Sequence, residues 1–410
     1  MEFRDYQLDI IKKGCRVLLD KGLLELTMEI RTGKTITAMG ICESIGINNV
    51  LFITKKKAIS SITADYAMYS PSFKIEVINY ESLHKIDMTS PDVIICDEAH
   101  SMGAFAKPNK RAKMVKDLIS KSRCKLILMS GTPTPESFSQ MYHQVYGHPN
   151  NPFNTYKNFY RWAVDYVNVK QKYINSQYIK DYSNGIETKI LFAMKPYMIS
   201  YTQKEAGFQS VIQEEVLEVD MSEQTYDLCK RLQRSLVIEG KEETILADTA
   251  VKLMQKLHQM YSGTVIFESG KSAVLDDTKA QFIHDNFYGK KIAIFYKFKA
   301  ELKALKETYG DDLTEDLDEF NTTDKCIALQ IVSGREGISL KEAEYIIYYN
   351  IDFSATSYWQ SRDRMTTKTR LNNKIYWVFS KGGIEYKIYK AVNKKKNYTV
   401  SHFKRDLLTL

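Results

Sequence analysis

The sequence has few cysteines, and they are widely separated. None of the six lies within a Cys-x-x-Cys spacing of another, so zinc clusters of the ribbon or finger type and a small disulfide scaffold are both disfavoured. We expect free thiols in a reducing compartment. The cysteines are Cys15, Cys42, Cys96, Cys124, Cys229 and Cys326.

Long hydrophobic runs are also lacking. The longest, such as Val93–Cys96 and Ile346–Tyr349, are far shorter than the roughly 20 apolar residues of a membrane-spanning helix. The first residues do not show the basic and then apolar regions of a secretory signal. Short internal repeats and low-complexity tracts are absent as well. We therefore expect a cytoplasmic, monomeric protein that does not contact a membrane.

A strong excess of one charge is missing too. Lysine and arginine total 58 against 50 aspartate and glutamate residues, which gives a net charge of +8. This balance permits a polyanionic partner without requiring one. Hydrophobic residues make up 44% of the 410 residues, enough for real cores. At about 150 residues per domain, the length predicts two or three domains.

Strand-length apolar runs lie along most of the chain. Many lack polar alternation, as parallel strands buried on both faces do. Helix-like stretches such as Thr35–Ile45 and Phe298–Glu307 lie between them. This alternation predicts α/β sheets with right-handed crossovers. The runs are Val50–Ile53, Ile75–Ile78, Val93–Cys96, Leu126–Met129, Ile292–Phe295, Cys326–Val332, Tyr345–Tyr348 and Ile375–Phe379.

These runs form two blocks, at about 1–205 and 270–410. Residues 220–262, between the blocks, are polar with helical spacing of their apolar residues, which predicts helices that extend from the sheet domains. Residues 138–200 carry many aromatic residues and are also predicted to be mostly helical. The C-terminal end is basic.

The clearest chemical pattern near the N-terminus is Thr32-Gly33-Lys34-Thr35. A Gly-Lys-Thr at the start of a helix lets backbone N–H groups hold phosphate, while the lysine reaches the β- and γ-phosphates and the threonine hydroxyl reaches Mg²⁺. The complete pattern G-x-x-x-x-G-K-[ST] is broken, because Met28 stands at its first position. Taken alone, Gly-Lys-Thr is equally compatible with an ordinary loop.

Two adjacent carboxylates, Asp97 and Glu98, end the apolar run Val93–Cys96. An aspartate at a strand tip can hold the Mg²⁺ shell, and a glutamate beside it can orient or deprotonate an attacking water. With Lys34, they predict a catalytic ATP site in which Thr35 and Asp97 hold the metal. We expect His100 to couple this site to the following strand.

Further polar residues follow other predicted strands. Ser130, Gly131 and Thr132 offer small hydrogen-bonding groups after one strand, although an ordinary turn would look the same. Arg362 and Arg364 in the second block cannot lose their charge, and an arginine can stabilise the charge that develops during phosphoryl transfer. A solvated basic helix face is an equally good explanation for Arg362.

Taken in order, these motifs resemble those of a superfamily 2 helicase, specifically of the Swi/Snf-type ATPases, over nearly the whole chain. Single matches are weak, and their order carries the resemblance. Besides the phosphate loop, the matching segments are Arg4–Gln7, Asn79–Leu83, Asp97–His100, Ser130–Pro133, Lys195–Ile199, Tyr201–Glu205, Met221–Tyr226, Lys291–Phe295, Gly337–Leu340 and Asp352–Arg364.

The resemblance implies two RecA-like lobes with parallel sheets and helical protrusions. The lobes would span residues 1–208 and 209–410, with an aromatic insertion at about 138–200, a helical protrusion at about 220–265 and a basic tail at 385–410. They would close over ATP and Mg²⁺ and grip a DNA strand across both. Hydrolysis would move the protein along that strand, generally 3′ to 5′.

The resemblance also implies individual roles. Gln360 and Arg364 would join the catalytic set, and the expected partner is duplex, forked or branched DNA with one strand tracked. The implied ATP contacts are Arg4, Gln7, Arg31, Thr32, Gly33, Lys34, Thr35, Gly337 and Arg364. The implied DNA contacts are Lys55, Lys56, Lys57, Asn79, Tyr80, Ser82, Lys297, Ser333, Ser339, Phe353 and Trp359.

The sequence departs from the family pattern in several places. Arg31 stands where the family usually has glycine, and Ser339 replaces an asparagine. Thr367 stands where a second arginine is usual, so the arginine finger can be Arg364, Arg362 or Arg370. Extra chromatin- or DNA-reading domains are lacking, which favours a compact motor of viral or bacteriophage type.

Two surface features have alternative explanations. Lys55–Lys57 can contact phosphates, each adding about −0.9 to the salt slope on duplex DNA, or can simply keep the surface soluble. Aromatic residues of the insertion can stack on bases, but the helical spacing of Tyr156, Phe159, Tyr160 and Tyr166 favours core packing.

Three functions compete at this point. The leading hypothesis is an ATP-driven DNA translocase or helicase that unwinds or branch-migrates forked DNA. An RNA helicase is the first alternative, because the tetrapeptide Asp97–His100 also occurs in RNA-remodelling enzymes. The second is a nucleotide-gated DNA clamp that does not translocate, which the missing arginine at Thr367 keeps open.

Overall fold

The computed structural model describes residues 2–29, 31–88, 90–174, 177–207, 211–331, 338, 340–354, 357–358, 361–365 and 372–393. The chain divides into two compact units, Met1–Phe208 and Gln209–Leu410. Among the described residues, none of the helices is both long and apolar enough to cross a membrane.

A six-stranded parallel sheet forms the centre of unit 1, in the order β3-β2-β4-β5-β1-β8. Its central strands are fully buried, which explains their uninterrupted apolar sequences. The strands are β1 (Leu23–Met28), β2 (Asn49–Thr54), β3 (Lys74–Asn79), β4 (Val93–Asp97), β5 (Lys125–Met129) and β8 (Met198–Tyr201).

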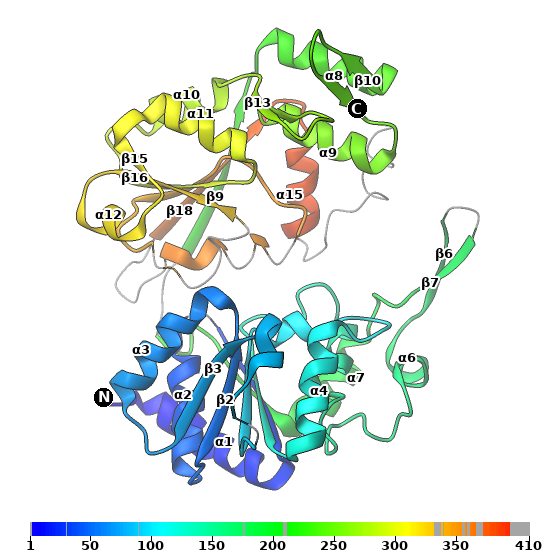
Figure 1. The fold of residues 1–410 in the computed structure, drawn as a ribbon, viewed down its shortest axis with the longest axis vertical. Coiled ribbons are helices and arrows are strands. Elements are labelled where there is room, and N and C mark those ends of the chain that lie inside the picture. The colour runs from blue at the N-terminus through cyan, green and yellow to red at the C-terminus, as the bar shows by residue number, and fades with distance from the viewer. Residues whose placement is uncertain are drawn as a thin grey trace. The chain divides into compact units, whose positions relative to one another are not determined.

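Helices cover both faces of this sheet (Figure 1). The apolar sides of α1 (Asp5–Lys21), α2 (Lys34–Ser44) and α3 (Ile59–Tyr69) form one core with the sheet. The opposite core is formed with α4 (Lys110–Ser122), α5 (Met141–Val145), α6 (Phe159–Tyr166) and α7 (Glu187–Met194).

The insertion at 138–200 is less helical than its sequence predicts. Its helices α5, α6 and α7 are short, and an antiparallel hairpin of β6 (Lys170–Ile174) and β7 (Gln177–Asp181) extends away from the body of unit 1 (Figure 1). Of the aromatic residues of α6, Phe159 and Trp162 are buried and Tyr166 is partly buried, whereas Tyr160 is exposed. Core packing is therefore the main role of the helical aromatic spacing.

Unit 2 is built around a second six-stranded parallel sheet, in the order β15-β16-β14-β17-β18-β9. The expected α/β class with two RecA-like parallel sheets is thereby confirmed. The strands are β9 (Val211–Val219), β14 (Ile292–Tyr296), β15 (Leu313–Thr314), β16 (Cys326–Gln330), β17 (Tyr345–Tyr348) and β18 (Asn372–Ser380).

Helices again pack on both faces of the unit-2 sheet. One core includes α8 (Glu223–Ser235), α9 (Ala250–Tyr261), α12 (Leu317–Thr322) and α15 (Glu385–Asn393), and the other includes α10 (Thr278–Asn286) and α11 (Lys299–Tyr309). The segment 220–265 contains the two expected helices, α8 and α9. It also forms small antiparallel pairs of β10 (Val237–Glu239) with β11 (Thr244–Leu246) and of β12 (Thr264–Ile266) with β13 (Ser272–Val274).

Candidate nucleotide-binding and nucleic-acid sites

The Gly-Lys-Thr loop connects β1 to α2, where a phosphate loop must lie. Gly33 caps α2 in the left-handed conformation, with φ at 80°, and the helix begins at Lys34. This φ favours glycine, and a Cβ atom on Gly33 would also lie 2.5 Å from Nε2 of Gln7. Arg31 also has a positive φ, 65°, a backbone conformation that favours glycine. Thr35 is the second residue of α2 and therefore lies at the helix N-terminus, where free backbone N–H groups can bind a phosphate.

The N-terminal segment holds this loop from one side. Gln7 Nε2 donates hydrogen bonds to the Gly33 carbonyl at 3.4 Å and to Thr37 Oγ1 at 3.3 Å. The Tyr6 hydroxyl donates to the Thr32 carbonyl at 3.0 Å and accepts a bond from Arg4 Nη1 at 2.8 Å. The segment predicted to contact ATP through Arg4 and Gln7 therefore also holds the phosphate loop in its conformation.

Asp97 and Glu98 lie at the carboxyl end of β4, next to the lysine of the loop. The Thr54 hydroxyl donates to Asp97 Oδ2 at 2.9 Å. Burial and the adjacent Glu98 charge raise the pKa of Asp97, although Lys34 partly offsets them. Burial would also raise the pKa of Glu98, but the nearby Lys34 and His100 outweigh burial and lower it. Glu98 is thus the carboxylate that stays ionised.

A chain of polar contacts runs from Glu98 to the end of β5. The His100 Nδ1 atom lies 3.1 Å from Glu98 Oε2 and 3.1 Å from Ser130 Oγ. Ser130 Oγ in turn accepts a bond from the Thr132 backbone N–H at 3.1 Å. Glu98 itself has φ 49°, a left-handed conformation that is costly for a residue with a side chain. Strain of this kind is typical of functional positions.

Gly131 completes the group of predicted residues around the lysine. A Cβ atom at Gly131 would lie 3.6 Å from Lys34 Nζ and 3.4 Å from the Met28 carbonyl. The structure therefore places Lys34, Asp97, Glu98, His100 and the turn at 130–132 close together within unit 1.

The donor set suits a magnesium–nucleotide complex. Mg²⁺ prefers hard oxygen ligands and is usually held by one or two carboxylates together with substrate phosphates. The described residues contain no cluster of three or more side chains that could hold a metal by itself. Desolvation and the adjacent Glu98 charge raise the pKa of the partly buried Asp97, and a divalent cation bound there would offset both effects. Asp97 and Thr35 are the residues that would hold the ion.

Tyr80 departs from its predicted role as a DNA contact. It is fully buried, and its hydroxyl donates to the Asp97 carbonyl at 2.8 Å. A buried ring cannot touch a DNA strand, so its effect in this structure is to position the end of β4. Asn79 and Ser82 beside it remain partly accessible, and Asn79 Nδ2 donates to Glu81 Oε2 at 3.2 Å.

The three lysines after β2 do not share one environment. Lys56 and Lys57 begin the short 3₁₀ helix Lys56–Ala58 and are exposed. Lys55 is only partly exposed, and its charge contributes to lowering the pKa of Glu98. Lys55 therefore lies toward the nucleotide site, whereas the other two face solvent.

In unit 2, the predicted DNA contacts Lys297 and Phe353 lie together. The ammonium of Lys297 is 2.7 Å from Asp352 Oδ1 and 4.2 Å from the centre of the Phe353 ring. Burial would raise the pKa of Asp352, but Lys297 reverses this and lowers it. Lys297 thus joins the end of β14 to the end of β17.

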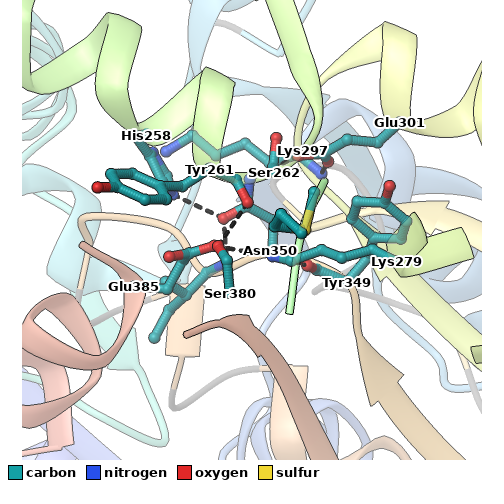
Figure 2. Close-up of polar contacts among 12 residues, drawn as sticks. His258, Tyr261, Ser262, Lys279, Lys297, Glu301, Tyr349, Asn350, Ser380 and Glu385 are labelled. Carbon is teal, nitrogen blue, oxygen red and sulfur yellow. Dashed lines mark hydrogen bonds and ion pairs between the residues drawn. The ribbon is translucent and has the colours of Figure 1, made fainter. Parts of the chain in front are cut away.

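A buried polar network lies next to Lys297 (Figure 2). His258 Nε2 is 2.6 Å from Asn350 Oδ1, and Asn350 Nδ2 donates to Glu301 Oε1 at 2.5 Å. Glu301 Oε2 accepts the backbone N–H groups of Lys297 and Phe298 at 2.7 and 2.9 Å. Burial lowers the pKa of His258, so its ring is neutral.

A fully buried ion pair lies nearby. Lys279 Nζ is 2.7 Å from Glu385 Oε1, and both side chains have no exposed surface. Lys279 also donates to the Tyr349 carbonyl at 3.3 Å, and Ser380 Oγ donates to Glu385 Oε1 at 2.9 Å. The pair connects α10 to α15 across the core (Figure 2).

The two described arginines of the second block differ in environment. Arg362 Nη1 lies 3.2 Å from Glu214 Oε1, and its guanidinium lies over the Tyr358 ring. Arg364 is buried, at 8% exposure, and its carbonyl accepts the Leu340 backbone N–H. Seven residues with predicted or alternative roles lie outside the described part of the chain: Ser333, Gly337, Ser339, Trp359, Gln360, Thr367 and Arg370.

Residue patterns missed three contributors to the site. The Thr54 hydroxyl donates a hydrogen bond to Asp97, and the Tyr6 hydroxyl donates one to the Thr32 carbonyl. The Thr37 hydroxyl accepts one from Gln7. Thr54 ends β2, and its proximity to Asp97 depends on β2 and β4 being neighbours in the sheet. The only available signal was a hydroxyl residue at the end of a predicted strand.

Comparison with known proteins agrees with these features. The family model of the SNF2-related domain matches residues 45–266, more than half of the chain. No curated protein matches.

Two solved structures from Sulfolobus solfataricus are similar at low identity. The SWI2/SNF2 ATPase core in complex with dsDNA is 15% identical, with 100% of this chain and 93% of that chain covered and a TM-score of 0.45. The SWI2/SNF2 ATPase core domain is 14% identical, with 96% and 89% covered and a TM-score of 0.43. On the family match, the chain belongs to the SNF2-related domain family and is a Swi/Snf-type, helicase-like ATPase.

Proposed function

We propose that this ATPase couples ATP hydrolysis to movement along DNA, and that it acts on forked or branched DNA. The observation that carries the proposal is the contact chain from Glu98 through His100 to Ser130. It joins the hydrolytic carboxylate to a turn outside the phosphate loop. A structural site would need no such connection, whereas a motor must transmit the state of the nucleotide.

The residues of unit 1 support a specific division of work. Lys34 and the N-terminus of α2 bind the phosphates, and Gln7 with Tyr6 keeps the loop in shape. Bound Mg²⁺ supplies charge neutralisation of the phosphates. Glu98 stays ionised and orients the attacking water, accepting its proton as the γ-phosphate is displaced.

For the arginine finger we propose Arg364. Arg362 is held by Glu214 and covers Tyr358, so withdrawing it would leave a carboxylate without its cation. Lys56 and Lys57 in unit 1 remain candidates for phosphate contacts, as do Asn79 and Ser82. In unit 2, we propose that Lys297 and Phe353 present a joint surface to the tracked strand, because their contact fixes the ends of two strands together.

ATPase rates on a panel of nucleic acids test the proposal. We expect duplex or forked DNA to raise the rate of the wild-type protein strongly and RNA to raise it little. Glu98→Gln should lower the stimulated rate by about 10²–10⁴-fold, because it removes the base but keeps the shape. Lys34→Ala should abolish the rate.

Glu187→Gln, at the exposed first residue of α7 and outside the residues placed in the site, is the matched control and should behave as wild type. Equal stimulation by RNA would favour the RNA-helicase alternative. Full DNA-stimulated turnover by Lys34→Ala would refute the assignment of the site.

A further inference from the structure

Unit 1 has a pocket at the N-terminal ends of its strands, opposite the ends that carry the nucleotide site. Its volume is ≈ 820 Å³, and it is lined by the ends of α1 and α4, the start of β5 and the loop at 146–157. Gly22 precedes β1 and Lys125 begins β5, whereas the phosphate loop and Asp97 follow the carboxyl ends of their strands. All strands of this sheet are parallel, so the pocket and the nucleotide site are separate.

The lining is strongly basic. Lys116, Arg123, Lys125 and Lys157 all border the pocket, against a single lining carboxylate, Asp20. Asp20 is paired with Lys21 at 2.9 Å, and within the described residues the four cations form no ion pair of their own. Only Arg123 stands at a helix C-terminus, where a cation complements the helix dipole, so this effect does not explain the set.

Arg123 occupies a position that suits a different residue. It caps α4 with φ 53° and ψ 30°, a left-handed conformation that costs a residue with a side chain about 1–2 kcal/mol and favours glycine or asparagine. An exposed arginine at such a position contributes nothing to the cap that glycine would not. Its charge at the pocket rim is the feature that glycine lacks.

The walls between these cations are aromatic and well fixed. Tyr146 lies under the Lys116 ammonium at 4.8 Å, and the partly exposed ring of Tyr156 lines the same pocket, whereas Tyr142 and Phe153 are buried in the core beside it. His148 packs against Gly22, where a Cβ atom would lie only 3.0 Å from its ring. Burial lowers the pKa of His148 to about 4, so the ring is neutral at physiological pH.

We propose that this pocket binds a nucleotide unit, with its phosphate on Arg123, Lys125 and Lys157 and its base against the aromatic wall. Pockets of roughly 300–1,000 Å³ suit ligands of this size. The cations can contact the phosphate, and the aromatic side chains can stack on the base. The nucleotide is either part of a nucleic-acid strand or free. Binding of a nucleotide within a nucleic-acid strand rests on the proposed function, whereas binding of a free nucleotide does not.

A charge-removing variant with a matched control tests the pocket. The pocket variant combines Arg123→Gly, Lys125→Gln and Lys157→Gln, and the control combines Lys12→Gln, Lys13→Gln and Lys74→Gln at exposed positions outside it. Both remove three positive charges. Binding of a labelled single-stranded DNA is followed by anisotropy across salt concentrations, and binding of dTMP by calorimetry.

If a strand occupies the pocket, the pocket variant should bind DNA on the order of tenfold more weakly than the control, with a salt slope reduced by about 2. If a free nucleotide occupies it, dTMP binding should fall selectively and DNA binding should not. Equal behaviour of pocket variant and control in both assays would overturn the proposal. Failure of the proposed function is read separately, as wild-type ATPase that DNA does not stimulate.

The single variant Arg123→Gly separates binding from folding. Relief of the left-handed conformation should leave the melting temperature equal to or above that of wild type, while nucleotide binding weakens. A lower melting temperature with unchanged binding would show that Arg123 serves the fold, which also contradicts the proposal.

Discussion

At the scale of single residues, two carboxylates of the candidate site in unit 1 are in environments that cost folding free energy. Glu98 is held in a left-handed conformation, and Asp97 beside it is partly buried with a raised pKa. Both costs fall at the ends of strands, where the rest of the fold can hold the residues in place. The same position brings the carboxylates within reach of Lys34, whose charge keeps Glu98 ionised.

Glu25 is a buried carboxylate outside the candidate site. It lies in the core of unit 1 without a described hydrogen-bond partner. Both carboxylate oxygens are buried and accept no hydrogen bond within the described structure. Burial raises the pKa of Glu25 to about 8 from an ordinary value of 4.5. Between these values the folded state holds a proton that the unfolded chain has lost, so stability falls as pH rises.

We therefore expect Glu25→Gln to remove part of the pH dependence of unfolding. The wild-type protein should lose up to about 1.4 kcal/mol per pH unit more than the variant between pH 5 and pH 8. Chemical denaturation of both proteins at the two pH values measures this difference. Parallel losses in wild type and variant would show that Glu25 is not protonated in the fold.

At the scale of elements, the sequence predicts strands well where they are buried on both faces. The uninterrupted runs of β2, β4 and β5 are all confirmed. Strand β1 was missed because Glu25 and Thr27 interrupt its apolar run, although both lie within the sheet. The hairpin of β6 and β7 was also missed, because aromatic residues in a polar segment suggest helix and strand equally.

The candidate site shows the same division. Gly33–Thr35 and Asp97–His100 are local motifs, and the structure gathers them as their spacing predicts. Contacts that depend on strand order, such as Thr54 with Asp97, could not be predicted. The role of Tyr80 was misjudged because burial depends on tertiary packing.

The buried pair Lys279–Glu385 gives a test at the scale of packed helices. Lys279→Met alone should cost about 3–5 kcal/mol of unfolding free energy, because it leaves a buried carboxylate unpaired. The double variant with Glu385→Met should cost clearly less than the single one. A thermodynamic cycle from denaturant unfolding measures the coupling.

The exposed pair Lys303–Glu307 on α11 is the matched control. Lys303→Met should change stability by less than about 0.5 kcal/mol, since solvent screens such pairs. Equal costs for Lys279→Met and Lys303→Met would contradict the assignment of Lys279–Glu385 as a structural link between α10 and α15.

At the scale of the whole molecule, two parallel sheets carry complementary parts of one proposed cycle. Unit 1 holds the residues that we propose bind and hydrolyse ATP. Unit 2 joins Lys297 and Phe353 at its strand ends and supports them with His258, Asn350 and Glu301.

Displacement of a triplex-forming strand from duplex DNA tests the central claim most directly, because it reports movement rather than binding. Wild-type protein with ATP should displace the third strand, and it should fail to do so with a non-hydrolysable ATP analogue. Glu98→Gln should bind the same DNA without displacing the strand. Displacement by Glu98→Gln, or DNA-stimulated hydrolysis by wild type without displacement, would contradict coupling of this site to movement along DNA.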